Sequence, residues 1–398
     1  MDMGTRPRRI AFVTTSRADY GHLYWPMMEA MKSPQIELSL IVLGAHLSPE
    51  FGHTIAEIEK DGFPITDRIE CLLSSDTDVG MAKTIGLATL SLAESLGRLR
   101  PDLLVLIADR YEMLAPASTA LALRIPIVHI EGGEVSEGAV DEAVRNALTK
   151  LSHVHLTPTE TSRRRVLAMG EEPWRVHRVG APSLDHLFRR RIPTRSEIEE
   201  DLGVDLSVPT ILVLYHPVTL ARDTTFEADA LYDALARVDQ QIVFCFPNAD
   251  AGSRALIERS REFCRHRPAA KLFVNLAHLE YWALLRQVSV LLGNSSSGIM
   301  ETPSLALPTV NVGIRQQGRE RARNVIDVAP EVESIRAALR RALQPDFRAS
   351  LEGLVNPYGD GHAAERIVGI LEEVELGERL LRKPAVPLHP IDEPSVVR

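Results

Sequence analysis

The segment IPIVHIEGGEVSEGAVDEAVRNALTKLSHVH, residues 125–155, decides the fold that this chain can adopt. It opens with the apolar run Ile125–Ile130, which is typical of a buried strand, and continues into Glu131 and a Gly-Gly pair. Apolar residues then recur at the spacing of an amphipathic helix. The predicted buried stripe contains Val140, Ala143, Val144, Ala147, Leu148 and Leu151. Ligands of open α/β sheets bind beyond the carboxyl ends of the strands, so we expect the residues just after Ile130 to form the base of the catalytic site.

The same alternation of strand and helix runs through the chain and predicts parallel, doubly wound sheets. In the first half, strands are expected at 10–14, 38–43, 103–107, 125–130, 153–157 and 175–179, with helices at 22–32, 81–99, 113–123, 140–151 and 160–169. The pattern restarts at Thr210, with strands at 211–215, 242–246, 271–274, 288–292 and 309–312 and helices at 227–237, 253–265, 279–287, 332–343 and 363–381.

This restart predicts two Rossmann-like doubly wound α/β domains that face each other across an interdomain cleft. We assign residues 1–188 to the first domain and residues 189–382 to a nucleotide-binding second domain that includes the terminal helix. Residues 383–398 form a Pro-rich tail that we expect to be disordered.

Composition narrows the class of protein. The 398 residues carry a formal net charge of −9, and no basic run contains interleaved aromatic residues, which argues against a nucleic-acid partner. The three cysteines are far apart in the sequence, as expected in a reducing cytoplasm. No apolar run reaches the roughly 18 residues of a membrane span, so no membrane partner is expected.

Acidic and basic side chains gather at the strand ends of the first half. The turn 14–21 contains Arg17, which either contacts a phosphate or simply faces solvent beside a capped helix start. Asp109 follows the apolar run LLVLI, where it acts either as a helix cap or, together with Glu131 and Asp141 or Glu142, in acid–base chemistry. His129 ends its strand as well, and a structural role is the more common one for such a residue.

In the second half, His216 ends the run ILVLY, where it could act as an acid or base or as a hydrogen-bond donor to a diphosphate. The run GNSSSGIME, residues 293–301, joins a buried strand to a helix start that suits a diphosphate, and its Glu301 could accept hydrogen bonds from ribose. The segment 315–319, RQQGR, adds cations, and FPNADAG at 246–252 could contact a base or sugar. No metal-ligand spacing is present.

Together these motifs resemble the UDP-N-acetylglucosamine 2-epimerases, in particular the hydrolysing branch that releases N-acetylmannosamine for sialic-acid-type sugars. The carriers are SRADYG from Ser16, ADRYE from Ala108, HIEGGE from His129, TKLSHVH from Thr149, FPNADAG, GNSSSGIME and RQQGR. The resemblance implies a glycosyltransferase-B fold, a homodimer or homotetramer, and a nucleotide-sugar substrate. It implies no cofactor, with magnesium as an optional companion of the diphosphate.

The resemblance also implies a mechanism: C2 loses its proton, UDP leaves to give a glycal, and water adds at C1. It assigns catalysis to Asp109, Glu131, Asp141, Glu142 and His216. Substrate or nucleotide binding falls to Arg17, Asp19, Arg110, His129, Arg145, Asn248, Ser295, Ser296, Ser297, Gly298, Glu301 and Arg315.

Two positions depart from the family pattern: Asn146 stands where a His is usual, and Ala108 where a Gly is usual. Both point to a related substrate, such as a 2,4-diacetamido sugar or a GDP-linked sugar. A non-hydrolysing epimerase, a glycosyltransferase of the same fold and a non-catalytic nucleotide-sugar binding protein are the alternatives. The several strand-end acids speak against a pure binder.

Overall fold

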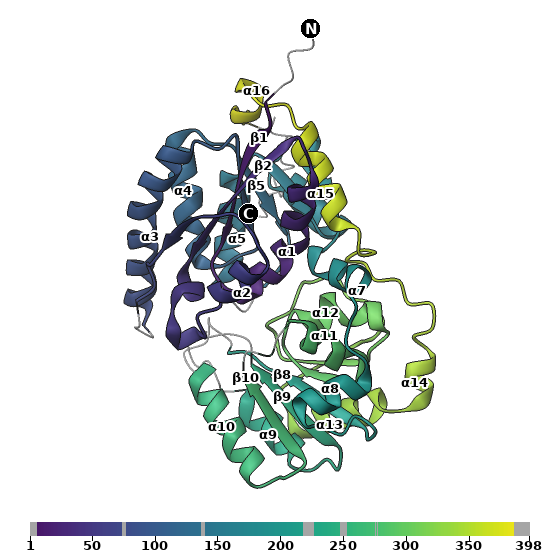
Figure 1. Cartoon of the computed structure of the whole chain (residues 1–398). Coiled ribbons are helices and arrows are strands. Elements are labelled where there is room, and N and C mark those ends of the chain that lie inside the picture. Colours follow the sequence, from purple (N-terminus) through teal and green to yellow (C-terminus); the bar gives the residue numbers. More distant parts are fainter. Residues whose placement is uncertain are drawn as a thin grey trace, which may run out of the picture.

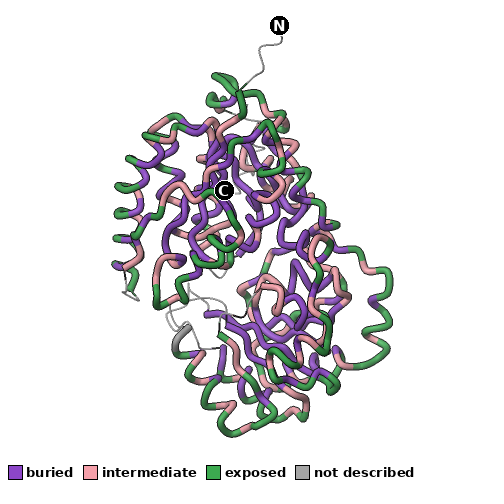
Figure 2. The backbone as a smooth tube through the Cα atoms, in the orientation of Figure 1, coloured by how far each residue is buried: buried purple, intermediate pink, exposed green. Residues whose placement is uncertain are grey.

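The computed structural model describes residues 6–73, 77–136, 140–217, 227–246, 253–274, 276 and 278–385. It contains two parallel α/β sheets, each covered by helices (Figure 1). The buried backbone follows the strands at the centre of each domain, while the exposed backbone lies mostly on the outer helices and loops (Figure 2). The predicted fold class of two Rossmann-like domains is therefore confirmed.

The first sheet has seven parallel strands in the order β3-β2-β1-β4-β5-β6-β7. Its strands are β1 (Arg8–Thr14), β2 (Ile36–Leu43), β3 (Ile65–Ile69), β4 (Leu103–Ile107), β5 (Ile127–Ile130), β6 (Val154–Thr157) and β7 (Val176–Arg178). Its helices are α1 (Arg17–Lys32), α2 (Ile55–Lys60), α3 (Asp78–Leu99), α4 (Leu114–Leu123), α5 (Asp141–Leu151) and α6 (Glu160–Ala168).

The second sheet has six parallel strands in the order β10-β9-β8-β11-β12-β13. Its strands are β8 (Thr210–Leu214), β9 (Gln241–Phe246), β10 (Ala270–Val274), β11 (Val290–Gly293), β12 (Thr309–Val312) and β13 (Val325–Val328). The helices of this half are α7 (Asp185–Arg189), α8 (Arg195–Leu202), α9 (Ala228–Leu235), α10 (Ser253–Arg265), α11 (His278–Gln287), α12 (Ser297–Met300), α13 (Val332–Ala342) and α14 (Pro345–Ala349).

The edge strands β3 and β13 were missed from the sequence because neither has a continuous apolar run. Their burial is only partial: β3 reads ITDRI and β13 reads VIDV, each with a charged residue in the middle. Edge strands need apolar residues on fewer sides than central ones, so their pattern is weaker.

The buried face of α5 differs from the predicted apolar stripe. Val140 and Ala143 are exposed, whereas Arg145 and Thr149 are buried beside Val144 and Leu148. The helix packs its apolar side chains on the core and directs Arg145 towards the carboxylates at the end of the sheet. Polar side chains therefore occupy part of the helix face that was predicted to be apolar.

The C-terminal helices return to the first domain. The predicted single helix 363–381 is two helices, α15 (Ala363–Glu373) and α16 (Glu378–Leu381), separated at Gly377 with φ 138°. Ala364, Ile367 and Leu371 join the core of the first sheet, and α15 lies beside α1 in Figure 1. The domain boundaries themselves remain a prediction.

The start of the predicted tail is held by hydrogen bonds. The Lys383 ammonium donates to the carbonyls of Lys150 and Ser152 at 2.9 and 2.6 Å. From residue 386 on, the tail lies outside the described residues. None of the helices in the described ranges combines the length and the apolar composition that crossing a bilayer requires.

Candidate active site

The candidate site lies where the strand order of each sheet reverses. In the first sheet this point lies between β1 and β4, and in the second it lies between β8 and β11. At such a point the connecting helices leave to opposite faces and open a crevice beyond the carboxyl ends of the strands. Arg17 and Asp109 follow β1 and β4, while His216 and Asn294 follow β8 and β11.

A cavity of about 190 Å³ opens between the two domains at these points. The first domain contributes Arg17, Ala18 and His22, all from the first turns of α1. The second domain contributes, among others, six residues assigned from the sequence: His216, Ser295, Ser296, Ser297, Glu301 and Arg315. The structure therefore brings these seven predicted residues, Arg17 included, into one cavity wall.

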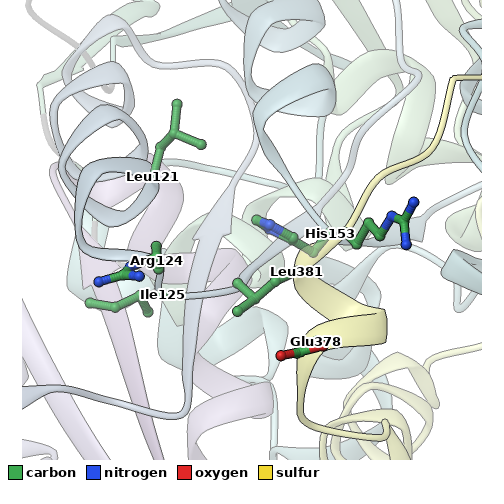
Figure 3. A pocket seen from close by; sticks show the side chains of 7 residues that line it. Leu121, Arg124, Ile125, His153, Glu378 and Leu381 are labelled. Carbon is green, nitrogen blue, oxygen red and sulfur yellow. The ribbon is translucent and has the colours of Figure 1, made fainter.

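A larger cavity of about 400 Å³ lies elsewhere on the first domain (Figure 3). Its wall contains Ile125 and His153, which precede β5 and β6, together with Leu381 of α16. It therefore opens at the amino ends of these strands, opposite the edge where parallel sheets bind ligands. We assign the chemistry to the interdomain cavity.

Glu131 forms a partly buried ion pair with His22, a residue that our sequence reasoning missed. The His22 Nδ1 atom lies 2.7 Å from Glu131 Oε1, and the two side chains are 24% and 8% exposed. Burial is the largest single effect and lowers the pKa of His22, but the charge and hydrogen bond of Glu131, together with the charges of Glu301 and Asp19, outweigh it and raise the pKa to about 9. Burial raises the pKa of Glu131, and the His22 contact reverses this to a net lowering. Near neutral pH the pair is an imidazolium and a carboxylate.

Asp109 and Glu142 share one guanidinium group. The buried Arg145 donates to Asp109, and its Nη1 donates to Glu142 Oε2 at 3.1 Å. The Ser136 amide also donates to Glu142 Oε2, at 2.7 Å, while Asn146 Nδ2 donates to Oε1 at 3.2 Å. Asn146 thus orients an acid, which is a role that a hydrogen-bonding amide performs without moving a proton. Asp141 opens α5 beside this cluster and is half-buried.

The backbone at the ends of β4 and β5 adopts a conformation that L-residues rarely occupy. Ala108 has φ 57° and Glu131 has φ 65°, both in the left-handed region. Such conformations cost about 1–3 kcal/mol and cluster at functional sites. The Ala108 amide donates to the Ile130 carbonyl at 2.9 Å, so the two strand ends hold each other in this geometry.

His216 is positioned by Asn294 across the reversal point of the second sheet. The His216 amide donates to Asn294 Oδ1 at 2.7 Å, and Asn294 Nδ2 donates to the His216 carbonyl at 2.8 Å. Both residues are buried. Asn294 lies in the GNSSSGIME motif. The motif alone does not indicate the contact with His216, which follows from the pairing of β8 with β11 because Gly293 pairs with Leu214.

The predicted helix after β11 is short, because α12 spans only Ser297–Met300. Its hydroxyl and carboxylate groups contact each other: Ser297 donates to Glu301, and Tyr281 contacts Ser297. Burial raises the pKa of Glu301. Gly298 allows close packing, since a Cβ atom there would lie 2.9 Å from Thr309 Cγ2. Arg315 Nη1 donates to the Asn294 carbonyl at 3.0 Å.

Three predicted binding residues make hydrogen bonds within the protein, and their binding roles stay a prediction. Both carboxylate oxygens of the buried Asp19 hold the turn after β1, where they accept from the Thr15 amide at 3.1 and 3.0 Å. His129 is fully buried, its pKa is lowered to about 4 by burial, and it lies 2.9 Å from the Ala108 carbonyl. Arg110 Nη2 donates to Glu112 at 2.9 Å.

Asn248 lies outside the described residues, as does most of the FPNADAG motif. Within the described ranges, no group of three or more His, Cys, Asp or Glu residues could hold a metal ion. The prediction that the protein needs no resident metal stays a prediction.

His278 and Tyr281 of α11 also line the cavity, and our sequence reasoning missed both. The His278 Nε2 atom accepts from Trp282 Nε1 at 3.0 Å, and its ring stands 4.0 Å from that of His186. An amphipathic helix pattern shows which residues are buried, but not which of them border an interdomain cavity.

These observations define the class: a two-domain α/β protein of glycosyltransferase-B type with clustered carboxylates and an interdomain cavity at its two reversal points. A family model described as UDP-N-acetylglucosamine 2-epimerase matches residues 28–372. The chain belongs to this family, as the motifs predicted.

Two relatives support the hydrolysing branch. The chain is 39% identical to the UDP-N,N'-diacetylbacillosamine 2-epimerase (hydrolyzing) of Legionella pneumophila over 94% of this chain and 98% of that protein. It is 35% identical to the GDP/UDP-N,N'-diacetylbacillosamine 2-epimerase (hydrolyzing) of Campylobacter jejuni over 86% and 89%. The fold matches UDP-GlcNAc 2-epimerase from Neisseria meningitidis bound to UDP-GlcNAc, with TM-score 0.77, 19% identity and coverage of 91% and 99%.

Proposed function

We propose that this enzyme hydrolyses a UDP-linked 2-acetamido sugar and inverts its configuration at C2, releasing UDP and the free manno-configured sugar. One observation carries the proposal. The ionised carboxylate of Glu131 is paired with His22, which lines the interdomain cavity, and the opposite wall of that cavity is built from hydroxyl, Arg and His groups suited to a nucleotide diphosphate.

The proposed reaction has two steps, the elimination of UDP and the addition of water. In the first, a carboxylate removes the C2 proton and the C1–O bond breaks, so the electron pair leaves on UDP and a glycal remains. In the second, water adds its oxygen at C1 and C2 receives a proton on the opposite face. The net reaction consumes one water for each UDP released.

We assign the proton transfers to Glu131 and to the pair Asp109 and Glu142, with Asp141 adjacent. The two arrangements differ in chemistry: Glu131 is held ionised by His22, whereas Asp109 and Glu142 share the single positive charge of Arg145. An acid and a base in distinct surroundings are what opposite proton transfers at one carbon require. His216, Arg17 and Arg315 are the candidates to stabilise the charge that develops on the diphosphate.

The preferred substrate is UDP-N,N'-diacetylbacillosamine, with UDP-N-acetylglucosamine as the second candidate. The support is that both relatives described above are named for diacetylbacillosamine, and that Asn146 and Ala108 depart from the usual family residues. The free product has the configuration that sialic-acid-type sugar synthesis consumes. We further propose a homodimer or homotetramer in the cytoplasm, consistent with the three free cysteines.

Proton NMR in deuterium oxide tests this proposal with each of the two nucleotide sugars in turn. Free UDP with a manno-configured sugar deuterated at C2 is the expected result, at a higher kcat/KM for the diacetamido substrate. Deuterium entering C2 while the sugar stays on UDP would replace the proposal with a non-hydrolysing epimerase. Tight UDP binding with no turnover of either sugar would indicate a binding protein, and size-exclusion chromatography with light scattering would measure the oligomer.

A further inference from the structure

Arg319 of the second domain reaches into the catalytic loop of the first, which we define as residues 131–136. Its Nε donates to the Val135 carbonyl at 2.7 Å, and its Nη2 donates to Ser136 Oγ at 3.3 Å. The side chain is only 6% exposed, and its Nη1 lies 3.7 Å from the buried carboxylate of Glu134. A guanidinium removed from water in this way is oriented by several acceptors at once.

Arg165 runs in the opposite direction, from α6 of the first domain to the second. Its Nη1 donates to the Gly133 carbonyl at 3.2 Å, and its Nη2 donates to the Gly318 carbonyl at 2.6 Å. The carbonyl acceptors therefore belong to the catalytic loop and to the residue next to Arg319. Two arginines, one from each domain, join the same two segments, and we call this arrangement the arginine clasp.

The catalytic loop packs tightly against α6, so a change in the position of either arginine would also shift the loop. Gly133 has φ 78°, and a Cβ atom there would lie 2.2 Å from the Ser162 carbonyl oxygen of α6. Ser162 also donates to Glu134, which accepts from the Tyr358 hydroxyl at 3.1 Å. The loop therefore has little room to move independently of α6.

From the clasp, hydrogen bonds through Ser136 and Arg145 lead to the catalytic acids. Ser136 Oγ, which accepts from Arg319, also accepts from Arg145 Nη2 at 3.1 Å, and Arg145 holds Asp109 and Glu142. In the other direction, the segment of Arg319 holds the nucleotide side, since Gln316 Nε2 donates to the Asn294 carbonyl at 2.8 Å. A continuous chain of contacts thus runs from the serine loop to the acids.

We propose that Arg165 and Arg319 are interdomain positioning residues that align the catalytic carboxylates with the nucleotide side of the cavity. The proposal rests on the proposed function for the identity of the acids. Arg319 acts through Ser136 and Arg145, and Arg165 acts through Gly133 of the same loop and through Gly318 beside Arg319, so their loss lowers turnover while nucleotide affinity is largely kept. Displacing a catalytic group by about 1 Å costs roughly a hundredfold in rate.

The test compares R319Q, R165Q and the double variant with R164Q. Arg164 is the matched control because it neighbours Arg165 on α6, its side chain is 78% exposed, and it forms an ion pair with Glu160 at 3.4 Å on the same helix. We expect kcat to fall about tenfold to a hundredfold in R319Q and R165Q, with UDP affinity by calorimetry changed less than about threefold. R319K should recover part of kcat, and R164Q should match the wild type.

The double variant separates positioning from independent damage. If both arginines belong to one clasp, the double variant loses about as much kcat as the worse single variant. Additive losses, a wild-type kcat in R319Q, or an equal fall in UDP affinity and kcat would each overturn the proposal.

Hydrogen exchange of the catalytic loop with UDP bound gives a readout that does not depend on turnover. The Ser136 amide donates to Glu142, so its protection reports the alignment of the loop. Protection that is lost in R319Q but kept in R164Q supports the clasp even if the wild type hydrolyses neither nucleotide sugar, a result that would overturn only the proposed function. Unchanged protection in R319Q would refute the clasp.

Discussion

The ion pair between His22 and Glu131 makes a quantitative prediction about stability and pH. The pKa of His22 is raised from 6.5 to about 9, because the charge and hydrogen bond of Glu131, with smaller contributions from Glu301 and Asp19, together exceed the opposing effect of burial. At about 1.36 kcal/mol per pKa unit, this shift corresponds to roughly 3 kcal/mol of favourable interaction. Since the ring keeps some exposure to solvent, we expect a measured coupling of about 2–3 kcal/mol.

The sign of the pH dependence follows from proton linkage. A raised folded-state pKa means that the contribution of His22 is complete below its unfolded pKa of 6.5 and is lost as the pH rises through about 9. Glu131 has a lowered pKa, so its contribution is present above its ordinary value of 4.5 and is lost as the pH falls below it. The pair therefore stabilises the fold most between about pH 4.5 and pH 6.5, and its contribution declines as the pH rises towards 9.

A double-mutant cycle of H22N, E131Q and the combined variant isolates the interaction. Urea unfolding followed by fluorescence measures each free energy, because Trp25 lies on the same helix as His22. The coupling should be about 2–3 kcal/mol near pH 7 and fall below about 1 kcal/mol near pH 10. A coupling under about 0.5 kcal/mol near pH 7, or one that is equal at both pH values, would refute the reasoning.

Three further changes have defined outcomes. Gly293→Ala should lower the free energy of unfolding by more than about 3 kcal/mol, because Gly293 has φ 147° and a Cβ atom would lie 1.9 Å from the Leu214 carbonyl oxygen. Gly86→Ala, with nothing within 4 Å, is the control and should raise it by about 0.5–1 kcal/mol in the same urea assay. Asn146→His should leave kcat within about threefold, because a His can also hydrogen-bond to Glu142, whereas Asn146→Ala should lower it about tenfold in a UDP-release assay. Removing magnesium with EDTA should change the UDP-release rate by less than about twofold, since the proposed proton transfers and the stabilisation of the diphosphate are assigned to side chains; a complete loss that added magnesium restores would contradict this.

Much of the candidate site could be placed from the sequence because parallel sheets put ligands at strand ends. Asp109, Glu131 and His216 each follow an apolar run, and that local pattern together with the family resemblance made them candidates, whose catalytic roles stay a prediction. The pattern did not show what their neighbours are. His129 ends a strand as His216 does, yet it is fully buried against the Ala108 carbonyl and does not line the cavity.

The amino-acid sequence by itself determined the alternation of the central strands and most of the helices, the two-domain α/β class and the strand-end acids, because periodicity and turn residues act over a few neighbouring positions. The tertiary structure alone decided which distant residues meet: His22 with Glu131, Asn294 with His216, and Arg319 with the catalytic loop. These pairs are separated by 109, 78 and more than 180 residues. Their contact depends on strand order and on how the domains pack, and no local pattern encodes either.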